Sequence, residues 1–152
     1  MKTLLYIVLA LVLAPVVFLA FKSLTSPPPK TGLAGGKLRP CPDSPNCVVS
    51  ENDTAASRIE ALRFEGAPDR AWSLLLQAVE RNGGSIREDR DGYLWATFTS
   101  RIFRFVDDVE FRLDAAHRVI QVRSASRAGY SDFGINRERV EKLRAAFVDA
   151  LK

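Results

Sequence analysis

The feature that most constrains the fold is a pair of alternating segments towards the C-terminal end of the chain. Residues 108–114 alternate apolar and charged side chains, a period of two that predicts a half-buried strand. After a short turn that holds His117, residues 119–124 resume the apolar pattern. The two segments therefore predict an antiparallel hairpin with one face turned to a core.

The register of this hairpin follows from the demand that both faces be satisfied at once. Pairing Leu113 with Ile120 puts apolar residues opposite one another on the core side, and it puts Glu110 opposite Arg123 on the other side. The same register pairs Phe111 with Val122 and Val109 with Ser124. A shift by one residue would turn every apolar side chain away from the core.

Other patterns predict the rest of the domain. They are a strand at 58–64, a helix from Pro68 that stops at Asn82-Gly83-Gly84, a strand at 85–90, a primed turn at Asp91-Gly92, a strand from Tyr93 that bends and continues through Phe105, and a last helix with Asn136 as its N-cap. This order predicts an α+β fold, β-α-β-β-β-β-α, with an antiparallel sheet of about five strands and both helices on one face.

The N-terminus is apolar enough to enter a membrane. Residues 3–21 contain 19 uncharged, mostly apolar side chains, flanked by Lys2 and Lys22. We interpret residues 1–22 as an uncleaved transmembrane signal anchor, with a cleaved signal peptide as the alternative. Residues 23–40 are rich in proline and glycine and are assigned to a linker, and residues 41–152 to a single domain.

Cys41 and Cys47 are the chain's two cysteines. In an exported protein such a pair most simply forms a disulfide that closes a small loop. A redox-active pair, or a reduced pair in a cytosolic domain, is the alternative. Two thiols and one distant His117 do not make a four-ligand zinc site, so we predict neither a metal nor a cofactor. The disulfide interpretation favours a domain on the periplasmic or extracytoplasmic side, most simply of a bacterial inner membrane.

The charge distribution argues against nucleic acid as a partner. The chain has 22 Lys and Arg and 18 Asp and Glu, but three of the lysines precede residue 31. Residues 31–152 therefore carry 19 basic and 18 acidic groups. This balance provides no general surface for phosphate contacts.

Polar residues gather where the hairpin ends and the last helix begins. The register predicts Asp107 near Ser124 and Ser126 on the core side, and Asp108 near Arg123 and Arg127 on the other face. Loop glycines then bring further polar groups to the same end, beside the amino end of the helix. The candidate ligand-binding residues are Asp107, Asp108, Arg123, Ser124, Ser126, Arg127, Asp132, Asn136 and Arg137.

Three interpretations of this set are open. The charged groups can simply satisfy one another, they can hold an anionic or polar ligand, or they can catalyse a reaction. Asp107 and Asp108 are weak candidates for an acid and base pair, because neighbouring strand residues point to opposite faces. Ser124 and Ser126 have no histidine close in sequence. We therefore assign no catalytic residue.

Three motifs resemble a known family. They are Cys-Pro-Asp-Ser-Pro-Asn-Cys-Val-Val-Ser at 41–50, Asp-Asp-Val-Glu-Phe at 107–111, and the segment at 123–139 that begins Arg-Ser-Ala-Ser-Arg. Together they resemble the domain of unknown function 1499 family, over about residues 39–151. The resemblance implies a small protein of bacteria or photosynthetic organelles, often with a leading hydrophobic segment. It implies that the motif residues act together, without naming an activity.

The leading functional expectation is a membrane-anchored, non-enzymatic binding or accessory domain. Its N-terminal helix would contact the membrane, and its polar corner would hold a small anionic or lipid-like ligand or an envelope protein. A hydrolase or transferase acting on an anionic envelope substrate is the first alternative. A purely structural interaction module is the second.

Overall fold

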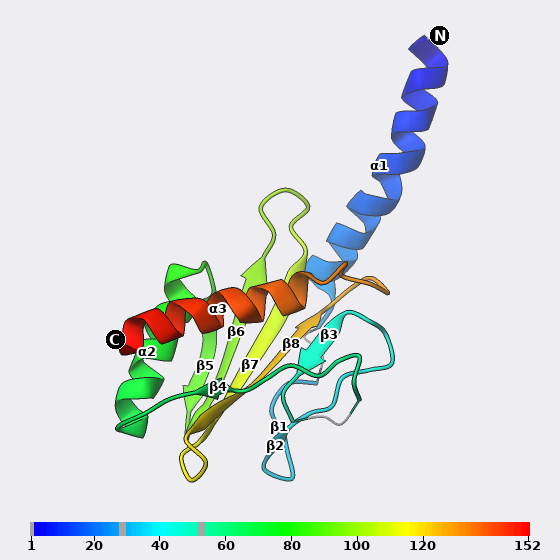
Figure 1. Cartoon of the computed structure of the whole chain (residues 1–152). Helices are drawn as coiled ribbons and strands as arrows, with labels where there is room; N and C mark the ends of the chain where they lie inside the picture. The colour runs from blue at the N-terminus through cyan, green and yellow to red at the C-terminus, as the bar shows by residue number, and fades with distance from the viewer. Residues whose placement is uncertain (1, 28–29, 52–53) are drawn as a thin grey trace.

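The computed structural model describes residues 2–27, 30–51 and 54–152. Helix α1 (Lys2–Thr25) projects away from a domain in which α2 (Pro68–Arg81) and α3 (Ile135–Leu151) lie against one face of a sheet (Figure 1). This arrangement confirms the predicted α+β class. Pro68 begins α2, as its fixed backbone angle favours at a first helical position.

The main sheet has six strands within the described residues, and its strand pairs are antiparallel. The order runs β3 (Cys47–Val49), β8 (Val119–Ser126), β7 (Val106–Asp114), β6 (Tyr93–Thr99) and β5 (Ser85–Arg90). β4 (Leu62–Arg63) pairs with the first residues of β8, on the same edge of that strand as β3. The predicted strand at 58–64 is therefore shorter than expected, and β3 was not predicted.

The predicted register of the β7–β8 hairpin is confirmed. Leu113 pairs with Ile120, and Glu110 pairs with Arg123. The primed turn between β5 and β6 is also supported, because Asp91 has φ 53° and Gly92 has φ 72°.

The core lies between the helices and one face of the sheet. Phe111 on β7 and Val122 on β8 are completely buried there, as are Leu75 on α2 and Phe147 on α3. These side chains alternate with those on the opposite face, so a single register supplies the core and also aligns the polar residues behind it.

A small hairpin covers part of the opposite face. β1 (Leu33–Ala34) and β2 (Lys37–Leu38) pair with each other, and Leu38 is buried with Val49 and Tyr93. The Leu38 N–H also donates to Glu51 at 2.8 Å. The assignment of residues 23–40 to a linker does not anticipate these contacts.

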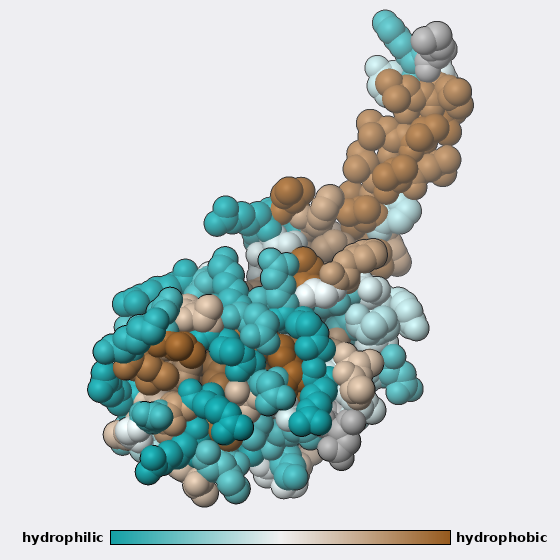
Figure 2. Space-filling view, in the orientation of Figure 1, coloured by the Kyte–Doolittle hydropathy of each residue, from teal (hydrophilic) through white to brown (hydrophobic). Residues whose placement is uncertain are grey.

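Helix α1 is long and apolar enough to be a membrane anchor or a signal sequence. Its side chains form the hydrophobic rod in Figure 2. A buried hydrogen bond joins its C-terminal end to the domain: the Ser23 hydroxyl accepts a 2.8 Å hydrogen bond from the Val106 N–H at the start of β7. This bond fixes where the helix leaves the domain.

The expected continuation of β6 through Ile102, Phe103 and Phe105 is wrong. β6 ends at Thr99, and residues 100–105 form the β6–β7 loop. Ser100 and Phe105 close this loop, since the Ser100 N–H donates to the Phe105 carbonyl and the Ser100 hydroxyl accepts from the Phe105 N–H. The apolar side chains within the loop, Ile102 and Phe103, are therefore exposed and are not part of the sheet.

The assignment of Asn136 as the N-cap of α3 is also wrong. The helix begins at Ile135, and the cap position is Gly134, with φ 85°. The capping carboxylate comes from Asp132, which accepts the Gly134 and Asn136 N–H groups at 3.0 and 2.8 Å. Asn136 is instead buried, with its amide turned towards the sheet.

Candidate functional site

Seven of the nine predicted site residues form two clusters on opposite faces of the sheet. The first faces the helices and is centred on the Asn136 amide, whose oxygen accepts from the Ser124 hydroxyl and from Arg139. The amide nitrogen donates to the Ser126 hydroxyl and to the Asn46 carbonyl, each at 2.9 Å. Every hydrogen-bonding direction of this buried amide is thus used.

Arg139 links this first cluster to Asp107. Its guanidinium donates to the Asp107 carboxylate and to the Asn136 oxygen, and it lies 5.2 Å from the centre of the Phe98 ring. Arg139 was not among the predicted site residues. Its spacing of three from Asn136 on a helix is the signal that could have identified it.

The second cluster lies behind the sheet and contains two buried ion pairs. Arg127 binds Asp108 through two hydrogen bonds of 2.7 and 2.8 Å, and the Trp95 ring N–H donates to the same carboxylate at 2.8 Å. The hydrogen bond to Asp108 raises the pKa of Arg127, against the opposing effect of burial. The positive charge of Arg127 is therefore balanced by the Asp108 carboxylate.

Glu110 and Arg123 form the second ion pair, with an N–O distance of 2.7 Å. The Glu110 carboxylate also accepts from the Tyr93 hydroxyl at 2.7 Å and from the Gly32 N–H at 2.8 Å. Glu110 and Tyr93 were not among the predicted site residues, although the register already placed Glu110 opposite Arg123. Gly32 ties the segment before the small hairpin to this pair.

Burial of the Tyr93 hydroxyl, together with the nearby Glu110 charge, raises the pKa of Tyr93 above its ordinary value of 10.0. A raised pKa means that the folded state holds the proton more tightly than the unfolded chain. The resulting stabilisation is complete below about pH 10 and is lost as the pH rises further. We therefore expect the free energy of unfolding to fall more steeply between pH 9.5 and pH 11.5 (~2 units around the unfolded pKa) in the wild type than in Tyr93→Phe. Urea unfolding across this range tests the expectation, and equal slopes would contradict it.

Asp132 and Arg137 take no part in the side-chain networks of the two clusters. Asp132 caps α3, as described above, while Arg137 is exposed and donates to the Ala56 carbonyl at 3.2 Å. Both line a pocket of about 460 Å³ beside the loop closed by the two cysteines. Asp132 thus reaches the first cluster only through the Asn136 backbone N–H, while the Arg137 side chain belongs to neither cluster.

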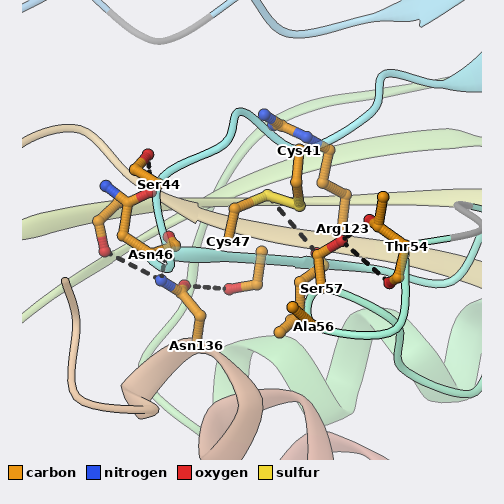
Figure 3. Close-up of a disulfide and its surroundings, with 12 residues drawn as sticks. Cys41, Ser44, Asn46, Cys47, Thr54, Ala56, Ser57, Arg123 and Asn136 are labelled. Carbon is orange, nitrogen blue, oxygen red and sulfur yellow. Dashed lines mark hydrogen bonds between the residues drawn. A yellow bond between two sulfur atoms is a disulfide. The ribbon is translucent and has the colours of Figure 1, made fainter. Parts of the chain in front are cut away.

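Cys41 and Cys47 form a disulfide, with their Cα atoms 5.6 Å apart. The loop that it closes is joined to the first cluster, because the Asn46 carbonyl accepts from Asn136 and the Asn46 amide donates to the Gly129 carbonyl. Figure 3 shows Asn46 and Asn136 facing one another beside the disulfide. The bridge therefore braces the loop on which the polar network rests.

Removing the disulfide should destabilise the domain by about 2 kcal/mol, because the cross-link no longer restricts the small loop in the unfolded chain. We expect this loss both for the Cys41→Ser and Cys47→Ser double variant and for the reduced wild type, measured by urea unfolding. Reductant should leave the double variant unchanged. A wild type whose stability is the same with and without reductant, once thiol titration shows complete reduction, would contradict this expectation.

A second pocket, of about 520 Å³, lies where α1 meets the domain; we term it the α1 pocket. Its apolar walls come from α1, from the β6–β7 loop and from the segment that follows β8: Val16, Leu19, Phe103, Phe105, Phe133 and Ile135. Its polar lining includes Asp107, Ser126 and Arg139 of the first cluster. The candidate site therefore borders a largely apolar space that sequence patterns did not predict.

The comparison with protein families is consistent with the motifs. The family model described as "Protein of unknown function (DUF1499)" matches residues 37–147. The chain belongs to the DUF1499 family. The match includes both ion pairs, the disulfide and the first helix-facing cluster, whereas α1 precedes it. No curated protein and no solved structure matches this DUF1499 chain significantly.

Proposed function

We propose that this protein is a membrane-anchored binding domain that holds a lipid-like amphiphile in the α1 pocket. The observation that carries the proposal is the place and chemistry of that pocket. Apolar side chains from α1 and from two loops surround it, and the Asp107, Ser126 and Arg139 groups border it on the domain side. An amphiphile has the matching division between an apolar chain and a polar group.

The size of the pocket suits a small ligand. Its volume of about 520 Å³ lies within the range of roughly 300–1,000 Å³ typical of small-molecule sites. The polar groups at its border are already held by one another, since Arg139 binds both Asp107 and Asn136. Such a rigid polar surface favours a ligand whose polar group needs only a few hydrogen bonds. It is less suited to an anion that needs an unpaired cation to balance its charge.

A small anion held by Arg123 and Arg127 has less support. Each arginine is paired with a buried carboxylate, so an incoming anion would have to displace Glu110 or Asp108. That exchange would leave a buried carboxylate without its partner, which is costly. Of the two ligand classes expected from the sequence, a lipid-like ligand is therefore better supported than a small anion.

The alternative of a hydrolase or transferase has no specific observation in its favour. The chain's only histidine, His117, lies in the β7–β8 turn against Asp114, and its hydrogen bond to Asp114 lowers the pKa of that carboxyl. This turn is at the opposite end of β7 from Asp107.

The disulfide and the apolar α1 together support a domain on the extracytoplasmic side of a membrane.

Native mass spectrometry of the full chain, extracted from membranes with a mild detergent, tests the proposal. We expect a population that carries one discrete additional mass, which collisional activation releases as an amphiphile. A chain found only at its bare mass, under conditions that preserve other lipid complexes, would contradict the proposed function.

A further inference from the structure

Two loops beside α1 carry large apolar side chains that the domain leaves in solvent. In the β6–β7 loop, Ile102 is 82% exposed. In the β8–α3 loop (residues 127–134), Tyr130 is 77% exposed and Phe133 is 96% exposed. Isolated exposed apolar residues are common on soluble proteins, but several on adjacent loops mark a contact surface.

The backbone conformation of these loops adds a second observation. Phe133 has φ 54° and Arg104 has φ 58°, in the left-handed region that bulky residues rarely adopt. No core packing rewards Phe133 for this conformation, since its side chain projects almost wholly outwards. Backbone strain at an exposed aromatic residue points to a contact that uses this orientation.

The position of α1 identifies what covers the loops. The apolar part of α1 ends at Phe21, Lys22 follows it, and Ser23 is hydrogen-bonded to Val106 directly after the β6–β7 loop. If α1 crosses a bilayer, the headgroup layer lies at Lys22, and the Ser23 hydrogen bond holds the start of β7 next to it. Figure 1 shows the β6–β7 loop rising beside α1, and Figure 2 shows hydrophobic atoms at its tip.

The charge of the β6–β7 loop fits a membrane surface. Arg101 and Arg104 flank Ile102 and Phe103, both arginines are exposed, and residues 100–105 contain no acid. Arginines beside apolar and aromatic side chains are the combination by which peripheral segments enter the boundary of an anionic bilayer. A second copy of the chain or a soluble protein would not account for the loops' position beside the helix.

We infer that the β6–β7 and β8–α3 loops form a second membrane contact, in which Ile102, Phe103, Tyr130 and Phe133 insert into the interfacial layer of the bilayer that α1 enters. The domain then lies directly on the membrane surface, and the α1 pocket faces the lipid. This inference goes beyond the proposed function, because the loops would dock whether or not the pocket holds a ligand.

The test uses the full chain in vesicles of phosphatidylcholine and phosphatidylglycerol. An environment-sensitive fluorophore is attached, without reductant, to Ile102→Cys, to Phe133→Cys, or to His117→Cys as the control at the opposite end. We expect fluorophores at 102 and 133 to be quenched several-fold more by spin-labelled lipid than the one at 117, and several-fold less by aqueous iodide. The Arg101→Glu and Arg104→Glu double variant should reduce lipid quenching at 102.

Other outcomes would overturn the inference. Iodide quenching at 102 and 133 equal to that at 117 would place the loops in water. Protection from both quenchers would mean that protein, such as a second copy, covers them. Ile102 lies outside the lining of the α1 pocket, and the same measurement in a Leu19→Trp background, which adds bulk to the pocket from outside both loops, should keep the lipid quenching at 102. Docking and ligand binding can therefore fail separately.

Discussion

Replacing Glu110 with alanine should destabilise the domain by about 3–5 kcal/mol, the largest loss that we expect from any single substitution here. The variant leaves Arg123 buried without its carboxylate. The Arg123 Nε already has no hydrogen-bond partner among the described residues, so the guanidinium depends on the groups that remain. The Tyr93 hydroxyl loses its acceptor in the same step, and the Gly32 N–H keeps only the Tyr93 oxygen as an acceptor.

Urea unfolding of the full chain in detergent measures this loss. Glu65→Ala is the matched control, because Glu65 is exposed, and it should change stability little. Replacing Glu110 and Arg123 together with methionine should recover most of the loss, since neither charge then remains buried alone. A Glu110 variant no less stable than the Glu65 variant would show that the ion pair does not hold the sheet to the segment around Gly32.

The second largest effect is expected for Asn136→Ala, at about 3 kcal/mol, because buried polar groups that lose their partners cost roughly 1–3 kcal/mol each. The substitution removes the acceptor for the Ser124 hydroxyl and for Arg139, and it removes the donor to the Asn46 carbonyl. The disulfide loop and the start of α3 should loosen together. Hydrogen exchange should therefore accelerate at both Asn46 and Ser126, whose backbone groups are bonded to each other.

Asn82→Ala is the control for this prediction. Asn82 also donates a side-chain hydrogen bond, to the Ala78 carbonyl, but it does so at the partly exposed end of α2. Its loss should cost no more than about 1 kcal/mol. If the two asparagine variants were equally stable, the helix-facing cluster would be no more than a set of surface contacts.

The parts of the fold predicted from sequence are those where two constraints agree. The β7–β8 register was predictable because the apolar alternation and the pairing of Glu110 with Arg123 select the same alignment. The β5–β6 turn was predictable because Asp91-Gly92 suits positive φ angles. In both cases the information lies within a few residues along one hairpin.

The failures have equally local causes. Phe103 and Phe105 continue the apolar pattern of β6, so periodicity alone extends the strand, whereas the structure turns at Ser100. Asn136 suits an N-cap and a buried amide equally well, and only the position of Asp132 decides between them. β3 has three residues, too few for any period to be visible.

The candidate site was only partly predictable for a different reason. The register correctly separated Asp107 from Asp108 by face, and it brought Arg127 to Asp108. The α1 pocket, by contrast, depends on Ser23 bonding to Val106, a contact between residues 83 apart in the chain. No local pattern encodes such a contact, so the apolar walls next to the polar cluster could not be foreseen.

The most direct test of the central claim is to fill the α1 pocket and count the bound amphiphile. Ala128 lines the pocket, and Ala116 lies exposed in the β7–β8 turn, so Ala128→Trp and Ala116→Trp add the same bulk at opposite ends. Native mass spectrometry of the two variants, extracted in parallel, should show the amphiphile retained by Ala116→Trp and absent from a still folded Ala128→Trp. Equal occupancy in both variants would contradict the proposal that this pocket is the binding site.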